Sequence, residues 1–440
     1  MMNWNTLLSN KRFGMEALHI RNHDDRTEFQ RDYDRLIFSA PFRRLQNKTQ
    51  VFPLPGSVFV HNRLTHSLEV ACVGRSLGNG VSRKLQEKQG EKFSPFIDEI
   101  GSIISAACLA HDLGNPPFGH SGEKAIATYF SEGEGTFLQK RMSTSEWKDI
   151  ITFEGNANAF RLLTHQFHGR RKGGFALTYS TLSSIAKYPY SSEYAIKKQK
   201  FGFFQSEKES FALIANELGI PLLEKNKYAR HPLVYLVEAA DDICYEIMDI
   251  EDAHKLKILT TSETKDLLLA FIPDERKERA KEVLKIVSDT NEQIAYLRST
   301  VIGLLIDACV EAFVTNEEFI LKGEFDSSLI KNIPQELKAA YNVCEEISLK
   351  RIYLSKDVVD IEIAGYNIIY TLINKFTSAV LSPEKSYSQM LLSRIPEQYQ
   401  TDSNNEYGKV QAVLDYVSGM TDIYALDLYQ KINGMSLPTL

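Results

Sequence analysis

The chain has 440 residues, of which 43% are hydrophobic and 25% are charged, with a formal net charge of −6. This composition allows a large buried core, and the length alone suggests roughly two to four domains. The most apolar stretch, residues 301–314, is interrupted by Asp307 and Glu311 and is too short to span a bilayer, which argues against a membrane protein.

The cysteine pattern points to a reducing compartment. None of the five cysteines forms a CxxC pair, and three lie in apolar helical runs, so we expect reduced core residues rather than disulfides. No signal peptide precedes the chain, and we therefore expect a cytoplasmic protein.

The first predicted helix of interest covers residues 62–70 and contains His66. Arg63 precedes His66 by three positions, which places both side chains on one helical face. A single histidine in such a pattern is more often a core or surface residue than a metal ligand. His66 therefore becomes informative only together with residues elsewhere in the chain.

Residues 107–123 are the most informative stretch of the sequence. Apolar residues at helical spacing run from Ile97 to Leu109, and Gly114 followed by two prolines predicts the end of that helix. His111 and Asp112 are then expected in its last turn, where unpaired carbonyls and the negative end of the helix dipole favour a cation. Two adjacent residues cannot complete a metal's coordination shell, so the remaining ligands must come from other segments.

His120 and Glu123 lie three positions apart at the start of the next predicted helix, which we expect Ser121 to cap. This spacing can place both side chains on one face, where Glu123 would orient His120 and raise its basicity for proton transfer. The alternative is that the pair only caps and solvates the helix start.

A third predicted helix, residues 233–248, carries Asp241 among apolar residues. Because an unpaired buried carboxylate is costly, Asp241 is expected to have a partner or a metal. Tyr245 and Asp249 follow at four-residue steps, so all three share one helical face and can line a pocket. Asp249 could equally belong to an exposed acidic run over residues 249–252.

Beyond residue 255, apolar residues again recur at helical spacing in segments 267–272, 280–294, 297–313 and 358–380. The sequence therefore predicts an all-α protein. No Gly-Ser or Pro-rich linker divides the chain, and the proposed ligands span residues 66–241, so that region must fold as one unit. We expect a core over residues 1–255 and a helical C-terminal region, 256–440, packed on it.

The order His66, then His111 with Asp112, then Asp241 resembles the pattern of the His-Asp (HD) metal-dependent phosphohydrolase superfamily. Within it, several longer motifs are similar to the deoxyguanosine triphosphate triphosphohydrolases (dGTPases). These motifs cover residues 32–39, 42–51, 63–66, 111–123, 153–157, 239–245 and 418–422. The resemblance extends from about residue 20 to about residue 430 and implies an HD-domain helical core.

The resemblance also implies roles for individual residues. His66, His111, Asp112 and Asp241 would bind one divalent metal ion, with His120 as general acid or base and Glu123 as its partner. A mixed nitrogen and oxygen shell suits Mn, Fe, Ni, Zn or Mg with little selectivity. Similarity to the family favours Mn or Mg. The residues implied in substrate binding are Gln50, Tyr245 and Asp249 for the deoxyribose and Arg63, Lys187, Tyr188 and Lys200 for the phosphates.

The expected activity is hydrolysis of dGTP to deoxyguanosine and tripolyphosphate. The alternatives are a broader-specificity or nucleotide-regulated dNTPase, an HD enzyme acting on another nucleotide phosphoester, and a non-catalytic nucleotide-binding protein. The resemblance implies a homo-oligomer, hexamer or tetramer, and leaves open a single-stranded DNA partner. The densest basic cluster, residues 169–174, could bind such a strand, although an exposed loop is the simpler reading.

Overall fold

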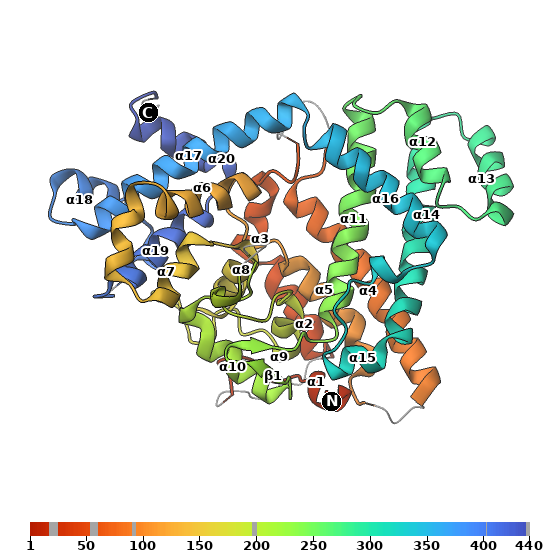
Figure 1. Ribbon diagram of the computed structural model, residues 1–440, viewed down its shortest axis with the longest axis horizontal. Helices are drawn as coiled ribbons and strands as arrows, with labels where there is room; N and C mark the ends of the chain where they lie inside the picture. Colours follow the sequence, from red (N-terminus) through yellow and green to blue (C-terminus); the bar gives the residue numbers. More distant parts are fainter. Residues whose placement is uncertain (17–24, 53–59, 90–93, 196–199, 402, 437–440) are drawn as a thin grey trace.

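The computed structural model describes residues 1–16, 25–52, 60–89, 94–195, 200–401 and 403–436. Helices dominate these residues (Figure 1), and the only sheet among them pairs two short antiparallel strands, β1 (Leu222–Glu224) and β2 (Lys227–Tyr228). The predicted all-α class is confirmed.

Three helices form the centre of the molecule: α4 (Arg63–Gln89), α5 (Ile100–Ala110) and α11 (Val234–Lys255). α5 packs along α4, and α11 packs against both. Nearly every residue of α5 is buried, as expected of a helix that is apolar on all sides. These three helices carry the residues of the predicted metal site.

The rest of the N-terminal half surrounds this centre. α2 and α9 pack against α5, while α6 and α7 pack on each other to one side (Figure 1). α2 and α7 each begin with a capping box, from Thr27 with Gln30 and from Ser143 with Glu146. The bounds are α1 (Trp4–Leu7), α2 (Glu28–Ile37), α3 (Ala40–Arg44), α6 (Gly119–Ser131), α7 (Thr144–Ile151), α8 (Gly155–Thr164), α9 (Tyr179–Ile185) and α10 (Lys208–Glu217).

The C-terminal half covers two sides of the centre. α14 packs on α4 and α11, whereas the long α17 crosses the molecule and packs on α6, α18, α19 and α20 (Figure 1). The bounds are α12 (Thr261–Leu269), α13 (Asp274–Ile286), α14 (Thr290–Thr315), α15 (Glu317–Lys322), α16 (Gln335–Ile347), α17 (Lys356–Leu381), α18 (Ser386–Leu392), α19 (Glu406–Ser418) and α20 (Asp422–Ile432).

The apolar interior consists of two clusters. The larger one is built around α4, α5, α11 and α14, and the smaller one joins α6 and α7 to α17, α19 and α20. Each cluster therefore takes residues from both halves of the chain. The expected boundary at residue 255 coincides with the end of α11, and the division into two regions stays a prediction.

No helix in the described part of the chain has both the length and the apolar character needed to cross a membrane.

Candidate active site

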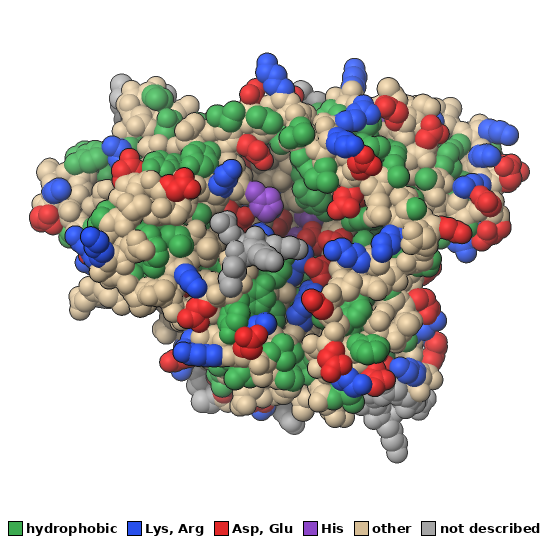
Figure 2. Space-filling model, viewed as in Figure 1, with side chains coloured by type: hydrophobic (Ala, Val, Ile, Leu, Met, Phe, Trp, Pro, Cys, Tyr) green, Lys and Arg blue, Asp and Glu red, His purple; other side chains and the backbone are tan. Residues whose placement is uncertain are grey.

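A cavity of about 650 Å³ opens between the central helices and the C-terminal half of the chain. Its walls come from the segment around Gln50, the loop from His111 to His120, helix α11 and residues 341–362. Figure 2 shows the corresponding hollow in the middle of this face, where a histidine lies among acidic and basic side chains.

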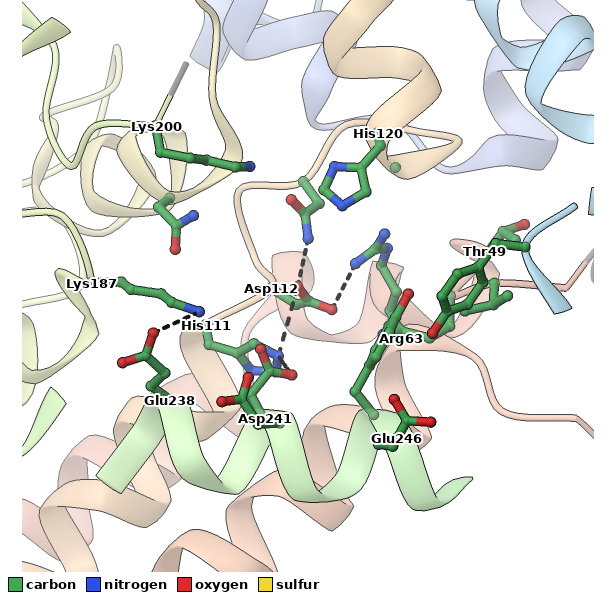
Figure 3. A pocket seen from close by; sticks show the side chains of 18 of the residues that line it. Thr49, Arg63, His111, Asp112, His120, Lys187, Lys200, Glu238, Asp241 and Glu246 are labelled. Carbon is green, nitrogen blue, oxygen red and sulfur yellow. Dashed lines mark hydrogen bonds and ion pairs between the residues drawn. The ribbon is translucent and has the colours of Figure 1, made fainter. Parts of the chain in front are cut away.

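Three predicted metal ligands from three different elements come together, and two of them, His111 and Asp241, line this cavity. His66 comes from α4, His111 directly follows α5, and Asp241 comes from α11, and their ligand atoms all lie within 4.8 Å of one another. Asp241 Oδ1 lies 3.1 Å from His66 Nε2 and 3.5 Å from His111 Nε2. Figure 3 shows His111 and Asp241 facing each other below the pocket.

The chemistry of this group fits a divalent cation. His111 Nδ1 lies 2.6 Å from the Cys108 carbonyl oxygen, which can only accept, so Nδ1 carries a hydrogen. This leaves Nε2 as the ring nitrogen that can bind a metal ion, and Nε2 is buried without a hydrogen bond. Burial opposes charge on both groups, but the charges of Asp112 and then of Asp241 raise the pKa of His111 to about 9, and the charge and hydrogen bond of His111 hold the pKa of Asp241 well below its usual value. An ion binding here would displace the His111 proton and meet an ionised carboxylate.

Asp112 lies beside this group rather than within it. Its Oδ2 accepts a hydrogen bond from Arg63 at 2.7 Å, and its Oδ1 accepts one from Asn115 and lies 3.7 Å from His111 Nε2. The structure thus brings His66, His111 and Asp241 together and places Asp112 next to them, paired with Arg63 (Figure 3).

The loop after Asp112 turns sharply before α6. Phe118 (φ +61°) and Gly119 (φ +55°) both adopt left-handed conformations, and a side chain at position 119 would lie 2.6 Å from Arg63 Nη2. α6 begins at Gly119 without a side-chain cap, so the expected cap by Ser121 is wrong. The Ser121 hydroxyl instead donates to the carbonyl oxygen of Glu362, because that acceptor from α17 lies against the helix start.

His120 and Glu123 form the predicted pair. His120 Nδ1 lies 2.8 Å from Glu123 Oε2, and the His120 side chain is 81% exposed at the cavity wall. Glu123 Oε1 accepts a second hydrogen bond, at 2.7 Å, from the backbone N–H of Gly155. A side chain at Gly155 would lie 2.9 Å from that carboxylate oxygen and 2.2 Å from Asn115. Although burial opposes its ionisation, the His120 hydrogen bond and the Lys200 charge lower the pKa of Glu123.

The predicted phosphate-binding residues all line the cavity: Arg63, Lys187, Tyr188 and Lys200. Lys187 Nζ lies 3.3 Å from Glu238 and Lys200 Nζ lies 2.8 Å from Glu154. Figure 3 shows the ion pair of Lys187 with Glu238, and both lysines lie across the pocket from Arg63. The cavity therefore has cations on more than one side.

Of the predicted sugar-binding residues, the structure brings Gln50 and Tyr245 to the cavity wall but not Asp249. Asp249 is 5% exposed and accepts a hydrogen bond at 2.7 Å from the hydroxyl of Tyr353, which itself lines the cavity and packs on Tyr245. Asp249 thus lies behind Tyr353 rather than at the cavity wall, and its contact with a sugar stays a prediction. The alternative of an exposed acidic run over residues 249–252 is wrong, because these residues are buried.

Sequence reasoning missed several wall residues. Tyr341 and Tyr353 come from the C-terminal half, where the sequence indicates only helices. Glu154 and Asn156 belong to the 153–157 motif, but their function was not assigned. Glu238 lies one turn before Asp241 on α11, a spacing that could have identified it.

The fold and this site define a class of protein. A helical core that presents two histidines and an aspartate from three helices, next to a histidine–carboxylate pair, is the arrangement of an HD domain. Residues 63–150 match the HD domain family, and residues 332–431 match the phosphohydrolase-associated domain family.

Similar proteins narrow this class further. The chain is 38% identical to a deoxyguanosinetriphosphate triphosphohydrolase-like protein of Pseudomonas aeruginosa over 100% of both chains. It is also 38% identical to one of Synechocystis over 99% of this chain and 100% of the relative. A deoxyguanosinetriphosphate triphosphohydrolase of Yersinia pseudotuberculosis is 28% identical over 92% of this chain and 93% of its own. The chain belongs to the dGTPase family of the HD superfamily.

Proposed function

We propose that this chain is a metal-dependent deoxynucleoside triphosphate triphosphohydrolase that prefers dGTP and releases deoxyguanosine and tripolyphosphate. The observation that supports it best is the group of His66, His111 and Asp241, which could hold a metal ion and of which His111 and Asp241 line the cavity. Arg63, Lys187 and Lys200 line the same cavity. The names of the relatives point to the same reaction.

Each part of the cavity has a task in this reaction. A divalent ion held by His66, His111 and Asp241, with Mn or Mg as our expectation, would supply Lewis acidity at the α-phosphate and activate the attacking water. Lys187 and Lys200 bind the negative phosphate chain, and Arg63 holds Asp112 while facing the same space.

The proton for the leaving 5′-oxygen comes from His120. Glu123 accepts the hydrogen of Nδ1, so Nε2 is the nitrogen that can deliver a proton into the cavity. The Glu123 charge stabilises the protonated imidazole before transfer.

The sugar is expected to lie between Gln50 and Tyr245. Gln50 Oε1 is buried without a hydrogen bond, which makes it available as an acceptor for a substrate hydroxyl. A site that offers a hydrogen bond to a hydroxyl rejects analogues that lack it, because its own polar group is then left unpaired.

The experiment is product analysis of all four dNTPs, each alone and in pairs, with Mn and with Mg. Deoxyguanosine with intact tripolyphosphate is the expected result. Pyrophosphate with a nucleoside monophosphate would contradict the bond assignment. Turnover of monophosphates or cyclic nucleotides in place of dNTPs would indicate an HD phosphohydrolase with another substrate. Tight dNTP binding without turnover would indicate a non-catalytic nucleotide-binding protein.

The homo-oligomer and the single-stranded DNA partner stay predictions from the family resemblance. Light scattering of the purified chain checks the first, and titration with a labelled oligonucleotide checks the second.

A further inference from the structure

Lys48 is a buried lysine that has no part in the proposed reaction. It belongs to the motif over residues 42–51, two positions before Gln50, and its exposed fraction is only 2%. Among the described residues it is the only buried lysine. Lysine is seldom buried in this way, because the removal of an ammonium group from water is costly. The contacts of Lys48 must therefore explain its position.

The ammonium group of Lys48 joins two segments that are far apart in the chain. Its Nζ donates hydrogen bonds to the carbonyl oxygen of Asn115 at 2.6 Å and to that of Ser418 at 2.9 Å. Asn115 belongs to the loop that follows Asp112, and Ser418 is the last residue of α19. The last carbonyl oxygens of a helix have no partner within that helix, and the helix dipole favours a cation beside them. One side chain thus stabilises both the helix end and the loop.

The backbone of Lys48 contacts a third segment. Its carbonyl oxygen accepts a hydrogen bond at 3.3 Å from the N–H of Arg63, the first residue of α4. His66 follows Arg63 by three positions on the same helix. Lys48 therefore touches both α4, which carries His66, and the loop next to Asp112.

Asn115 in turn holds a predicted metal ligand. Its side-chain Nδ2 donates to Asp112 Oδ1 at 2.5 Å, and its backbone N–H donates to the Asp112 carbonyl oxygen at 3.2 Å. The other carboxylate oxygen of Asp112 accepts from Arg63. Because Lys48 fixes the backbone of Asn115, a loss of its ammonium group would release one of the two groups that orient the Asp112 carboxylate.

A second side chain links the same loop to the same helix end. Asn158 Nδ2 donates to the Gly114 carbonyl oxygen at 2.7 Å and lies 3.1 Å from the Ser418 hydroxyl. Two buried polar side chains from different segments thus attach this loop to the end of α19. Lys48 differs from Asn158 in that it also contacts the first residue of α4.

Electrostatics shows that the buried ammonium group is costly. Burial, and then the charge of Arg44, lower the pKa of Lys48 to about 7, while the charge of Asp422 acts in the opposite direction. The more distant charges of Arg63 and Asp112 oppose each other. Both acceptors of Nζ are neutral carbonyl oxygens, and no carboxylate in the described part of the chain forms an ion pair with it. An ion pair therefore does not explain the burial of Lys48.

We propose that Lys48 is a positioning residue of the metal site, which holds the loop after Asp112 against α19 and α4 and so sets the affinity for a divalent ion. An apolar side chain of similar length would avoid the cost of a buried ammonium group, but it would leave two buried carbonyl oxygens without a partner. Groups that orient metal ligands change metal affinity or activity by roughly 10- to 100-fold when they are removed. The inference rests on the metal site of the proposed function, but not on the identity of the substrate.

The test is isothermal titration calorimetry of Mn into the full chain after EDTA treatment and desalting. Lys48→Met keeps an unbranched side chain and removes the donors, so we expect its Kd for Mn to rise at least about tenfold. In dNTP hydrolysis, the Mn concentration for half-maximal rate should rise by a similar factor, with little change in kcat at saturating Mn. The matched control is Lys338→Met, whose ammonium group also donates to a backbone carbonyl oxygen, that of Lys331, but at the surface. The control should bind Mn like the unaltered chain.

A second variant separates positioning from folding. Lys48→Ala leaves space for added propylammonium, which supplies the missing amine and should restore most of the Mn affinity. Unchanged Mn affinity in Lys48→Met would overturn the proposal. Recovery of thermal stability alone with propylammonium, or failure of both variants to fold, would also overturn it, because Lys48 would then serve only the fold. An unaltered chain that binds Mn but leaves dNTPs intact would refute the proposed function and not this inference.

Discussion

At the scale of single residues, the Glu123 carboxylate makes two contacts, and a substitution can alter one while it keeps the other. One carboxylate oxygen binds His120 Nδ1 and the other binds the Gly155 N–H. Glu123→Gln can keep the second contact through its carbonyl oxygen, but its amide would present hydrogens to His120 and disfavour the protonated imidazole. We expect kcat for dNTP hydrolysis to fall by on the order of 100-fold with little change in KM.

Steady-state kinetics with its pH profile measures this effect, and Glu132→Gln, an exposed residue at the end of the same helix, is the control. An unchanged kcat in Glu123→Gln would show that the His120–Glu123 hydrogen bond has no role in the reaction. The pH profile should also shift, because the proton donor would lose its charged partner.

His61 illustrates how one partly buried histidine can couple stability to pH. Burial opposes its protonation, but hydrogen bonds to Asp252 at 2.8 Å and Glu69 at 3.1 Å outweigh burial and raise its pKa to about 10. An unfolded histidine has its ordinary pKa of about 6.5. The raised pKa therefore adds stability in full below pH 6.5, and that stability is lost as the pH rises toward 10.

We expect the free energy of unfolding of the unaltered chain to decrease between pH 6.5 and pH 10 by more than that of His61→Gln. Urea unfolding at several pH values within this window measures the difference. His168→Gln, whose side chain is 45% exposed, is the control and should follow the unaltered protein. Parallel curves for His61→Gln and the unaltered chain would contradict the assignment.

At the scale of elements, the last helix holds the active-site loops in place. Asp422, the first residue of α20, accepts hydrogen bonds from the backbone N–H groups of Thr49 at 2.8 Å and of Phe118 at 3.0 Å. Thr49 precedes Gln50, and Phe118 precedes His120 by two residues. One buried carboxylate thus fixes two cavity segments relative to each other.

Asp422→Asn retains only one acceptor oxygen, so one of these N–H groups would lose its partner. We expect kcat/KM for the nucleotide substrate to fall by roughly tenfold, the effect of about 1 to 2 kcal/mol from one unpaired buried group. Asp427→Asn, on the exposed side of the same helix, should leave it unchanged. A loss of thermal stability without any change in kinetics would show that Asp422 supports only the fold.

The elements also show which features a sequence can predict. The helices of the metal site were predictable because their apolar spacing is regular, and α5 ends at Ala110, one residue before His111. The positions of Tyr353 and Asp422 at the site could not be predicted, because both residues form hydrogen bonds with residues more than a hundred positions away in the chain. Ser121 was misassigned for the same reason, since its acceptor, Glu362, comes from α17.

At the scale of the whole molecule, the metal site depends on the packing of the core, because its residues come from the helices that form the core. His66, His111 and Asp241 belong to, or directly follow, the three helices that form the centre of the fold. The family pattern could predict that these three residues converge. It could not predict that Asp112 would accept a hydrogen bond from Arg63. A ligand that binds all three helices should therefore stabilise the entire fold.

A divalent ion provides that test. An ion that binds only the folded chain adds about 2.7 kcal/mol at 100 times its Kd, so Mn added to EDTA-treated protein should raise Tm by several degrees. Asp241→Asn removes the negative charge of the carboxylate that lies next to both histidines and should abolish most of this rise, whereas Asp360→Asn, an exposed residue of α17, should keep it. Because the readout is thermal unfolding, it does not depend on turnover. An equal rise in Asp241→Asn and the unaltered chain would mean that the ion binds at another place.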